Sequence, residues 1–137
     1  MSTIYPSNPV TRAALEAHER IEPRKYVTGT VGFQDSWVDS GVNPVYYRKS
    51  VDGIVFVAGQ CSRASIPAFP STIFQLPRGY RPNRSHVWLV DSSQTPLAVS
   101  RIDIGGTGLV KLDETQVAPG SIGLFLQLCF PIDAEIT

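Results

Sequence analysis

The last part of the chain alternates between large apolar residues and other residues with a period of two. From Ile122 to Ile132 every second position carries a large aliphatic or aromatic side chain, and glycine and glutamine occur among the residues in between. Because successive side chains of a β-strand point to opposite faces, this period predicts a strand with one apolar face. The predicted buried face consists of Ile122, Leu124, Leu126, Leu128, Phe130 and Ile132.

Similar apolar segments upstream, separated by turn residues, predict further short strands. The dipeptide Asp52-Gly53 is a strong hairpin signal, Gly105–Gly108 predicts a second hairpin, and Ala118–Ser121 predicts the last turn. We therefore predict an all-β fold, an antiparallel β-sandwich or barrel of about seven to eight strands with a short N-terminal helix. The predicted strands before the last one are Val45–Ser50, Ile54–Gln60, Thr72–Leu76, His86–Val90, Leu97–Ile104 and Leu109–Leu112.

The N-terminal residues follow the pattern of an amphipathic helix. Asn8 followed by Pro9 is typical of a helix start, and helix-forming residues continue until Pro23. A helix of this length is marginal alone in water, so we expect it to pack on its own domain, on copies of itself or on a larger assembly. The predicted anchoring or oligomerisation seam has coiled-coil spacing and consists of Val10, Ala14, Ala17 and Ile21.

These patterns divide the chain into two parts. Residues 1–29 are predicted to form a helical arm and a linker, with the linker at Pro23–Gly29. Residues 30–137 are predicted to form the β domain.

Two of the predicted strands are apolar on both faces. In Ile54–Cys61 large apolar side chains occupy even and odd positions, and the second face of the last strand carries Phe125 and Cys129. An antiparallel sheet usually leaves one face polar. We therefore expect a second subunit to cover the sheet in a closed homo-oligomer, with a trimer as the favoured form.

Composition narrows the choice of partners. The chain has 137 residues, enough for one domain, and its formal net charge is zero. A neutral chain does not indicate a nucleic-acid partner. No apolar run approaches the roughly 18 residues that a membrane span needs, so we expect no membrane insertion. Since the segment Met1–Pro9 lacks the features of a signal peptide, we expect synthesis in a cytoplasm without export by a standard route.

The sequence offers no pattern for catalysis or for metal binding. It contains no Walker loop and no GxGxxG, HExxH or GxSxG motif. Neither His18 nor His86 has a neighbouring ligand at metal-site spacing. We predict no enzymatic activity, no metal and no cofactor. Cys61 and Cys129 both lie in apolar runs and are interpreted as small buried hydrophobic residues, although a disulfide is possible.

Aromatic residues beside charged ones suggest a binding surface. Flat rings next to polar groups offer a stacking platform with a hydrogen-bonding rim, which suits a saccharide or a protein partner. The alternative interpretation is that these rings pack in the core or between subunits. The residues predicted to form this ligand or subunit surface are Trp37, Tyr80, Arg81 and Trp88.

The order of several segments resembles a known family. A tryptophan at Trp37 is followed by the Asp-Gly hairpin within Tyr46–Gly59 and by the sequence IFQLPRGYRP at Ile73–Pro82. An RIDI strand at Arg101 and a GSIGLFLQLCF strand at Gly120–Phe130 complete the pattern. From Thr30 onward this order is similar to that of the C-terminal β domains of tailed-bacteriophage minor tail, tail-fibre or receptor-binding proteins.

The resemblance implies a non-enzymatic β-sandwich or barrel on the virion surface, commonly trimeric and often binding host-cell saccharides. We therefore predict a structural virion protein, assembled in the cytoplasm of the bacterial host. In the leading hypothesis it is a homotrimeric, tail-associated host-binding module that its N-terminal arm anchors to other virion proteins. The alternative is a capsid decoration or head-fibre protein that docks on the shell through the arm. A third hypothesis, a small enzyme acting on surface glycans, lacks a visible catalytic constellation.

Overall fold

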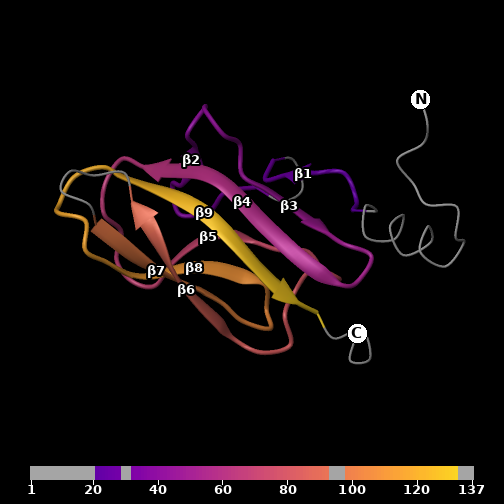
Figure 1. Cartoon of the computed structure of the whole chain (residues 1–137). Coiled ribbons are helices and arrows are strands. Elements are labelled where there is room, and N and C mark those ends of the chain that lie inside the picture. Colours follow the sequence, from indigo (N-terminus) through magenta and orange to yellow (C-terminus); the bar gives the residue numbers. More distant parts are fainter. Residues whose placement is uncertain (1–20, 29–31, 93–97, 133–137) are drawn as a thin grey trace, which may run out of the picture.

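The computed structural model describes residues 21–28, 32–92 and 98–132. Over these residues the chain forms nine antiparallel strands and no helix (Figure 1). Most of the predicted N-terminal helix, with Val10, Ala14 and Ala17, lies outside the described residues. The strands are β1 (Lys25–Tyr26), β2 (Val38–Asp39), β3 (Tyr46–Lys49), β4 (Ile54–Arg63), β5 (Ser71–Gln75), β6 (His86–Ser92), β7 (Ala98–Ile104), β8 (Leu109–Thr115) and β9 (Ile122–Pro131).

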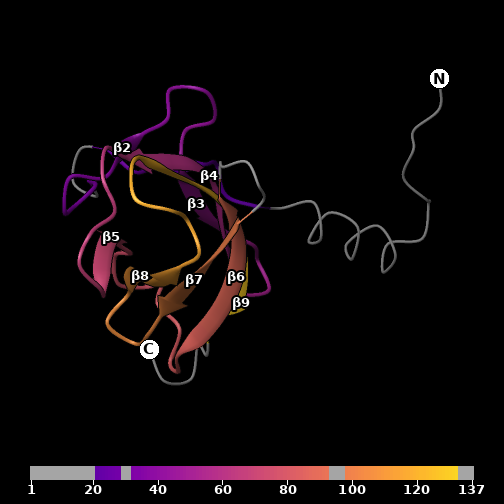
Figure 2. The same cartoon turned by 90° about the vertical axis from the view of Figure 1, so that its left-hand side faces the viewer.

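All nine strands belong to one sheet. Its order is β1-β3-β4-β9-β6-β7-β8-β5, and β2 pairs with β4 beside β3. Figure 2 shows these strands arranged around a common interior, so that the sheet forms a curled half-barrel. The prediction of an antiparallel all-β fold is confirmed, and its form is a single curled sheet.

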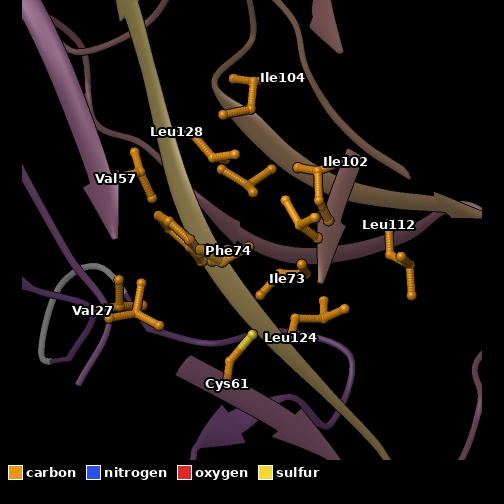
Figure 3. Packing of buried hydrophobic residues seen from close by; sticks show 14 of the residues in the cluster. Val27, Val57, Cys61, Ile73, Phe74, Ile102, Ile104, Leu112, Leu124 and Leu128 are labelled. Carbon is orange, nitrogen blue, oxygen red and sulfur yellow. The ribbon is translucent and has the colours of Figure 1, made fainter. Parts of the chain in front are cut away.

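The core fills the interior of this curl. Along β9 the predicted alternation is confirmed, because Ile122, Leu124, Leu126, Leu128 and Phe130 are all buried. Ile132 lies just beyond the strand and is half-buried. Side chains from β4, β5, β7 and β8 point toward the same interior (Figure 3). Full burial of such a side chain stabilises the fold by about 1.5–3 kcal/mol, so this interior dominates the energetics of folding.

A polar turn covers the free edge of β5. Asp35 and Ser36 both have positive φ, 50° and 64°, and the Trp37 amide donates to the Gln34 carbonyl over 3.0 Å. Two central residues of this kind make a tight turn of the hairpin type. The Gln34 amide then donates to the carbonyl of Ile73 in β5 over 2.8 Å. The turn therefore satisfies a backbone acceptor that the sheet itself leaves unpaired.

The segment before β2 differs from the expected linker. Lys25 and Tyr26, within Pro23–Gly29, form β1 and pair with Tyr47 and Tyr46 of β3. Ile21, a residue of the predicted helical seam, forms an antiparallel bridge with Ser50 instead. The sheet therefore begins before Thr30. The division of function between an arm and a displayed domain stays a prediction.

Candidate functional site

The outer face of the sheet is apolar where β4, β9 and β6 lie side by side. Phe56 of β4 pairs with Cys129 of β9, and both side chains lie on the face opposite the core. Leu89 is 72% exposed, Val87 48% and Phe125 41%. We name Phe56, Val87, Leu89, Phe125 and Cys129 the outer apolar face. Gln60 and Gln127 lie on the same face among these residues. Exposed apolar side chains gathered on one face of a sheet are typical of an interaction surface.

The two cysteines have different environments. Both are free thiols, and only Cys61 is buried, whereas Cys129 is exposed on the outer apolar face. The interpretation of both as buried residues is therefore wrong for Cys129, because the odd positions of β9 point away from the core. Burial raises the pKa of the Cys61 thiol to about 12.

A groove of about 560 Å³ borders this face. Leu89 and Phe125 lie at one side of it, and Tyr26 and Tyr46 lie at the other. Its size falls in the range of small-ligand sites, roughly 300–1,000 Å³. The polar residues that line it include three amides, Asn43, Gln60 and Gln127, and the carboxylate of Asp91.

Gly59 allows one wall of the groove to form. The segment that carries Asn43 and Pro44 lies directly on β4, where the Gln60 amide donates to the Asn43 carbonyl over 2.8 Å. A Cβ at Gly59 would lie 2.5 Å from the Pro44 carbonyl oxygen, and the φ of Gly59 is +128°. Any side chain at Gly59 would therefore push this segment away from the sheet.

Tyr46 organises the basic side of the groove. The guanidinium carbon of Arg24 lies 4.6 Å from the Tyr46 ring centroid, and that of Arg48 lies 5.6 Å away. The ring of Tyr26 meets Tyr46 edge-on, with 6.3 Å between centroids. Since Tyr26 is 44% exposed, it offers a free aromatic surface beside two cations.

Tyr80 lies inside the molecule, where it ties β1 to the loop after β5. Its side chain is buried against Tyr47, with ring centroids 5.0 Å apart. The Lys25 ammonium donates to the Tyr80 hydroxyl over 2.6 Å, and that of Lys49 donates to the Gly79 carbonyl over 3.0 Å. We name Lys25, Lys49 and Tyr80 the tyrosine clasp. Burial raises the pKa of Tyr80, and the hydrogen bond to Tyr80 raises the pKa of Lys25.

Arg81 closes the same loop. Its Nε donates to the Leu76 carbonyl over 2.7 Å, and the Leu76 amide donates to the Gly108 carbonyl over 2.8 Å. Because Gly108 has no side chain, the stem of Arg81 can pass within contact distance of its Cα. The IFQLPRGYRP segment therefore ends in a loop held by its own arginine and tyrosine.

The two predicted tryptophans occupy separate places. Trp37 is 2% exposed, and its indole donates to the Ser71 hydroxyl over 2.9 Å. Trp88 is half-buried and stacks on His86, with ring centroids 5.7 Å apart. Trp37, Tyr80 and Trp88 thus pack with different neighbours and do not form one surface. For Trp37 and Tyr80 these contacts match the alternative interpretation, packing within the core.

Sequence reasoning missed the residues that line the groove. Arg24 and Tyr26 lie in the expected linker, whereas Tyr46 lies in a predicted strand, together with Arg48, which contacts its ring. One signal was available: in each segment an arginine and a tyrosine are two residues apart, which places both on one face of a strand. The pairing of Tyr26 with Tyr46 then brings the two faces together.

In the described part of the chain, no group of histidine, cysteine and acidic side chains is arranged to hold a metal ion. Among the same residues, no helix has the length and apolar character required to cross a membrane.

The fold resembles those of two phage proteins. The receptor-binding protein of Listeria phage PSA matches 85% of this chain and 69% of its own length, with a TM-score of 0.64 and 14% identity. The head domain of lactococcal phage bIL170, a receptor-binding domain, matches 80% of this chain and 97% of its own length, with a TM-score of 0.60 and 13% identity. No protein-family model and no curated sequence matches the chain. The expected resemblance to phage receptor-binding domains is therefore confirmed for the fold.

Proposed function

We propose that the chain is the host-binding module of a bacteriophage tail, displayed on the virion surface as a homotrimer. The observation that carries this proposal is the fold shared with receptor-binding domains of two phages. In this proposal the N-terminal arm anchors the module to other virion proteins. Its activity is binding, without catalysis.

The ligand in this proposal is a saccharide of the host surface, and its site is the groove beside Tyr46. The exposed ring of Tyr26 supplies a stacking surface for a sugar ring. The amides of Asn43, Gln60 and Gln127 supply donors and acceptors that match hydroxyl groups.

The outer apolar face supports the homo-oligomer. Leu89 at 72% exposure and Val87 at 48% are costly to leave in water, and covering them with an identical chain removes that cost. Closed rotational symmetry is the usual arrangement of copies of one chain. The number of three copies rests on the resemblance to phage tail proteins.

Microscopy of virions tests the location. Gold-labelled antibody against the chain is expected to decorate the tail tip. Decoration of the head would contradict the tail role and would support the alternative, a capsid decoration protein.

Binding to purified host-cell envelopes tests the activity. The wild-type protein is expected to sediment with the envelopes, and the folded Tyr26→Ala variant is expected to sediment less. Release of sugars from the envelopes would support an enzyme instead of a binding module.

A further inference from the structure

Two buried polar side-chain atoms in the described part of the chain lack a hydrogen bond, and both belong to the outer face of the sheet. They are Nε of Arg48 in β3 and Oδ1 of Asp103 in β7. Both residues are half-buried, whereas their neighbours Tyr47, Ile102 and Ile104 fill the core. A buried polar atom without a partner costs free energy, so each of these charged groups calls for a compensating contact.

The register of the sheet places the two residues at opposite borders of the outer apolar face. Arg48 pairs with Phe56, and Phe56 pairs with Cys129. On the other side of the face, Val87 pairs with Asp103. Because β9 and β6 are neighbours in the sheet, one row of side chains crosses this face from a cation to an anion.

No residue within 21–28, 32–92 and 98–132 forms an ion pair with either group. The guanidinium carbon of Arg48 lies 5.6 Å from the Tyr46 ring centroid, and the only other charged group over that ring is Arg24. Asp103 is opposite Lys111 of β8, but the ion pair of this region joins Arg101 to Asp113 instead, over 3.9 Å.

The two borders have opposite charge. At the β3 border, Arg24 adds a second positive charge beside Arg48. At the other border, the charged residues of β6, β7 and β8 are mostly acidic: Asp91, Asp103, Asp113 and Glu114, against Arg101 and Lys111. A positive border and a negative border on either side of an apolar centre are complementary to each other.

The borders of one chain are too far apart to neutralise each other. Four strand spacings separate β3 from β7 in the sheet order. At about 4.8 Å per spacing, Arg48 and Asp103 are about 19 Å apart along the sheet. A second copy of the chain, by contrast, carries both borders and the apolar centre between them at the same spacing.

We propose that the outer apolar face binds a second copy of this chain head to tail, with Arg48 beside Asp103 of the partner subunit. A contact between two different borders uses each border once per subunit and closes into a ring. The apolar side chains are buried at the centre of the contact, and the charges fix its register. This inference rests on the homo-oligomer of the proposed function, and it adds the residues that orient the subunits.

Charge exchange in the full chain tests this contact. Sedimentation equilibrium over a range of protein concentrations measures the dissociation constant of the oligomer. Arg48→Asp and Asp103→Arg each place like charges in the contact, and each is expected to raise this constant by at least about tenfold. The double variant, Arg48→Asp with Asp103→Arg, restores opposite charges and is expected to recover most of the lost affinity. Since the two positions are about 19 Å apart within one chain, this recovery requires a contact between chains.

Arg78→Asp is the matched control, because it reverses an exposed arginine in the loop after β5, a strand at the other end of the sheet order from β3. It is expected to assemble as the wild type does. Wild-type affinity in both single variants would overturn the contact between Arg48 and Asp103 of the partner subunit, while the homo-oligomer would stand. A double variant that dissociates as readily as the single variants would overturn the contact as well. A wild-type chain that is monomeric at micromolar concentration would instead overturn the homo-oligomer of the proposed function.

Discussion

At the scale of single residues, Gly59 decides whether the groove exists. Its φ of +128° lies in a region that residues with a side chain rarely adopt, and the backbone of Pro44 and Val45 lies directly against it. Gly120 has a similar φ of +133°, but no atom lies within 4 Å of the position of its missing Cβ. A comparison of these two positions therefore separates the strain of a positive φ from the clash of a new side chain with neighbouring backbone atoms.

Alanine substitutions at these glycines measure the close approach. Both variants carry the strain of a positive φ, of order 1–3 kcal/mol. Gly59→Ala is expected to lower the free energy of unfolding by about 1–3 kcal/mol more than Gly120→Ala, because its new methyl group must displace backbone atoms. Urea denaturation of both variants checks this difference. Equal losses in the two variants would mean that the segment at Pro44 is free to move.

At the scale of elements, the strands that follow from local patterns were predicted and the ones that depend on distant partners were not. The alternation of β9 and the Asp52-Gly53 hairpin are local signals, and both identify the strands around them. In contrast, Lys25–Tyr26 carries no strand pattern of its own, because two residues cannot show a period. It is a strand only because β3 offers it an edge. Since Arg24 and Tyr26 belong to this segment, the groove could not be predicted from local sequence.

The tyrosine clasp joins β1 to the loop after β5. Because of it, we expect the folded protein to lose stability in alkali. The pKa values of Tyr80 and Lys25 are raised from their ordinary values of 10.0 and 10.5. A pKa that is higher in the folded state means that the folded protein holds its proton longer than the unfolded chain. The stabilisation is therefore complete below pH 10 and decreases as the pH rises through the folded pKa values.

Denaturation midpoints measured across this alkaline range test the clasp. Tyr80→Phe is expected to be less stable near neutral pH, since it lacks the bond to Lys25, and to lose less stability than the wild type in alkali. Tyr26→Phe, which removes an exposed phenol outside the clasp, is expected to follow the wild-type profile. Burial also raises the pKa of Cys61 to about 12, and this contribution remains in both variants. A Tyr80→Phe profile parallel to that of the wild type would show that the clasp contributes nothing to the alkaline transition.

At the scale of the whole molecule, the two faces of the single sheet have different roles. Its inner face builds the core, and its outer face combines exposed apolar side chains with the groove. The apolar residues on both faces of β4 and β9 were visible in the sequence and predicted a covered sheet. The sequence did not indicate which side chains meet on the outer face, because this depends on the order of the strands. β6 is far from β4 in sequence, and the two strands share this face because β9 lies between them.

A charged residue in the outer apolar face is expected to separate the subunits. Leu89→Glu places a carboxylate where a second copy would otherwise bury an aliphatic side chain, and leaving such a charge buried and unpaired is strongly unfavourable. Light scattering is expected to show a trimer for the wild type and a monomer for Leu89→Glu. Val51→Glu is the control, because Val51 is 57% exposed in the turn between β3 and β4, and it is expected to remain trimeric.

Thiol labelling of Cys129 gives an independent view of the same face. In the assembled trimer this cysteine is expected to react slowly, and in the Leu89→Glu monomer it is expected to react fast. A wild-type chain that is monomeric at micromolar concentration, with Cys129 fully reactive, would contradict the use of the outer apolar face between subunits.

Competition for phage adsorption tests the central claim, recognition of the host surface, most directly. Host cells are saturated with the purified wild-type protein, and the rate at which phage particles adsorb to them is then measured. The host-binding function predicts a marked fall in the adsorption rate with the wild type and little change with the folded Tyr26→Ala variant. An adsorption rate that is unchanged by a saturating amount of the wild-type protein would contradict it.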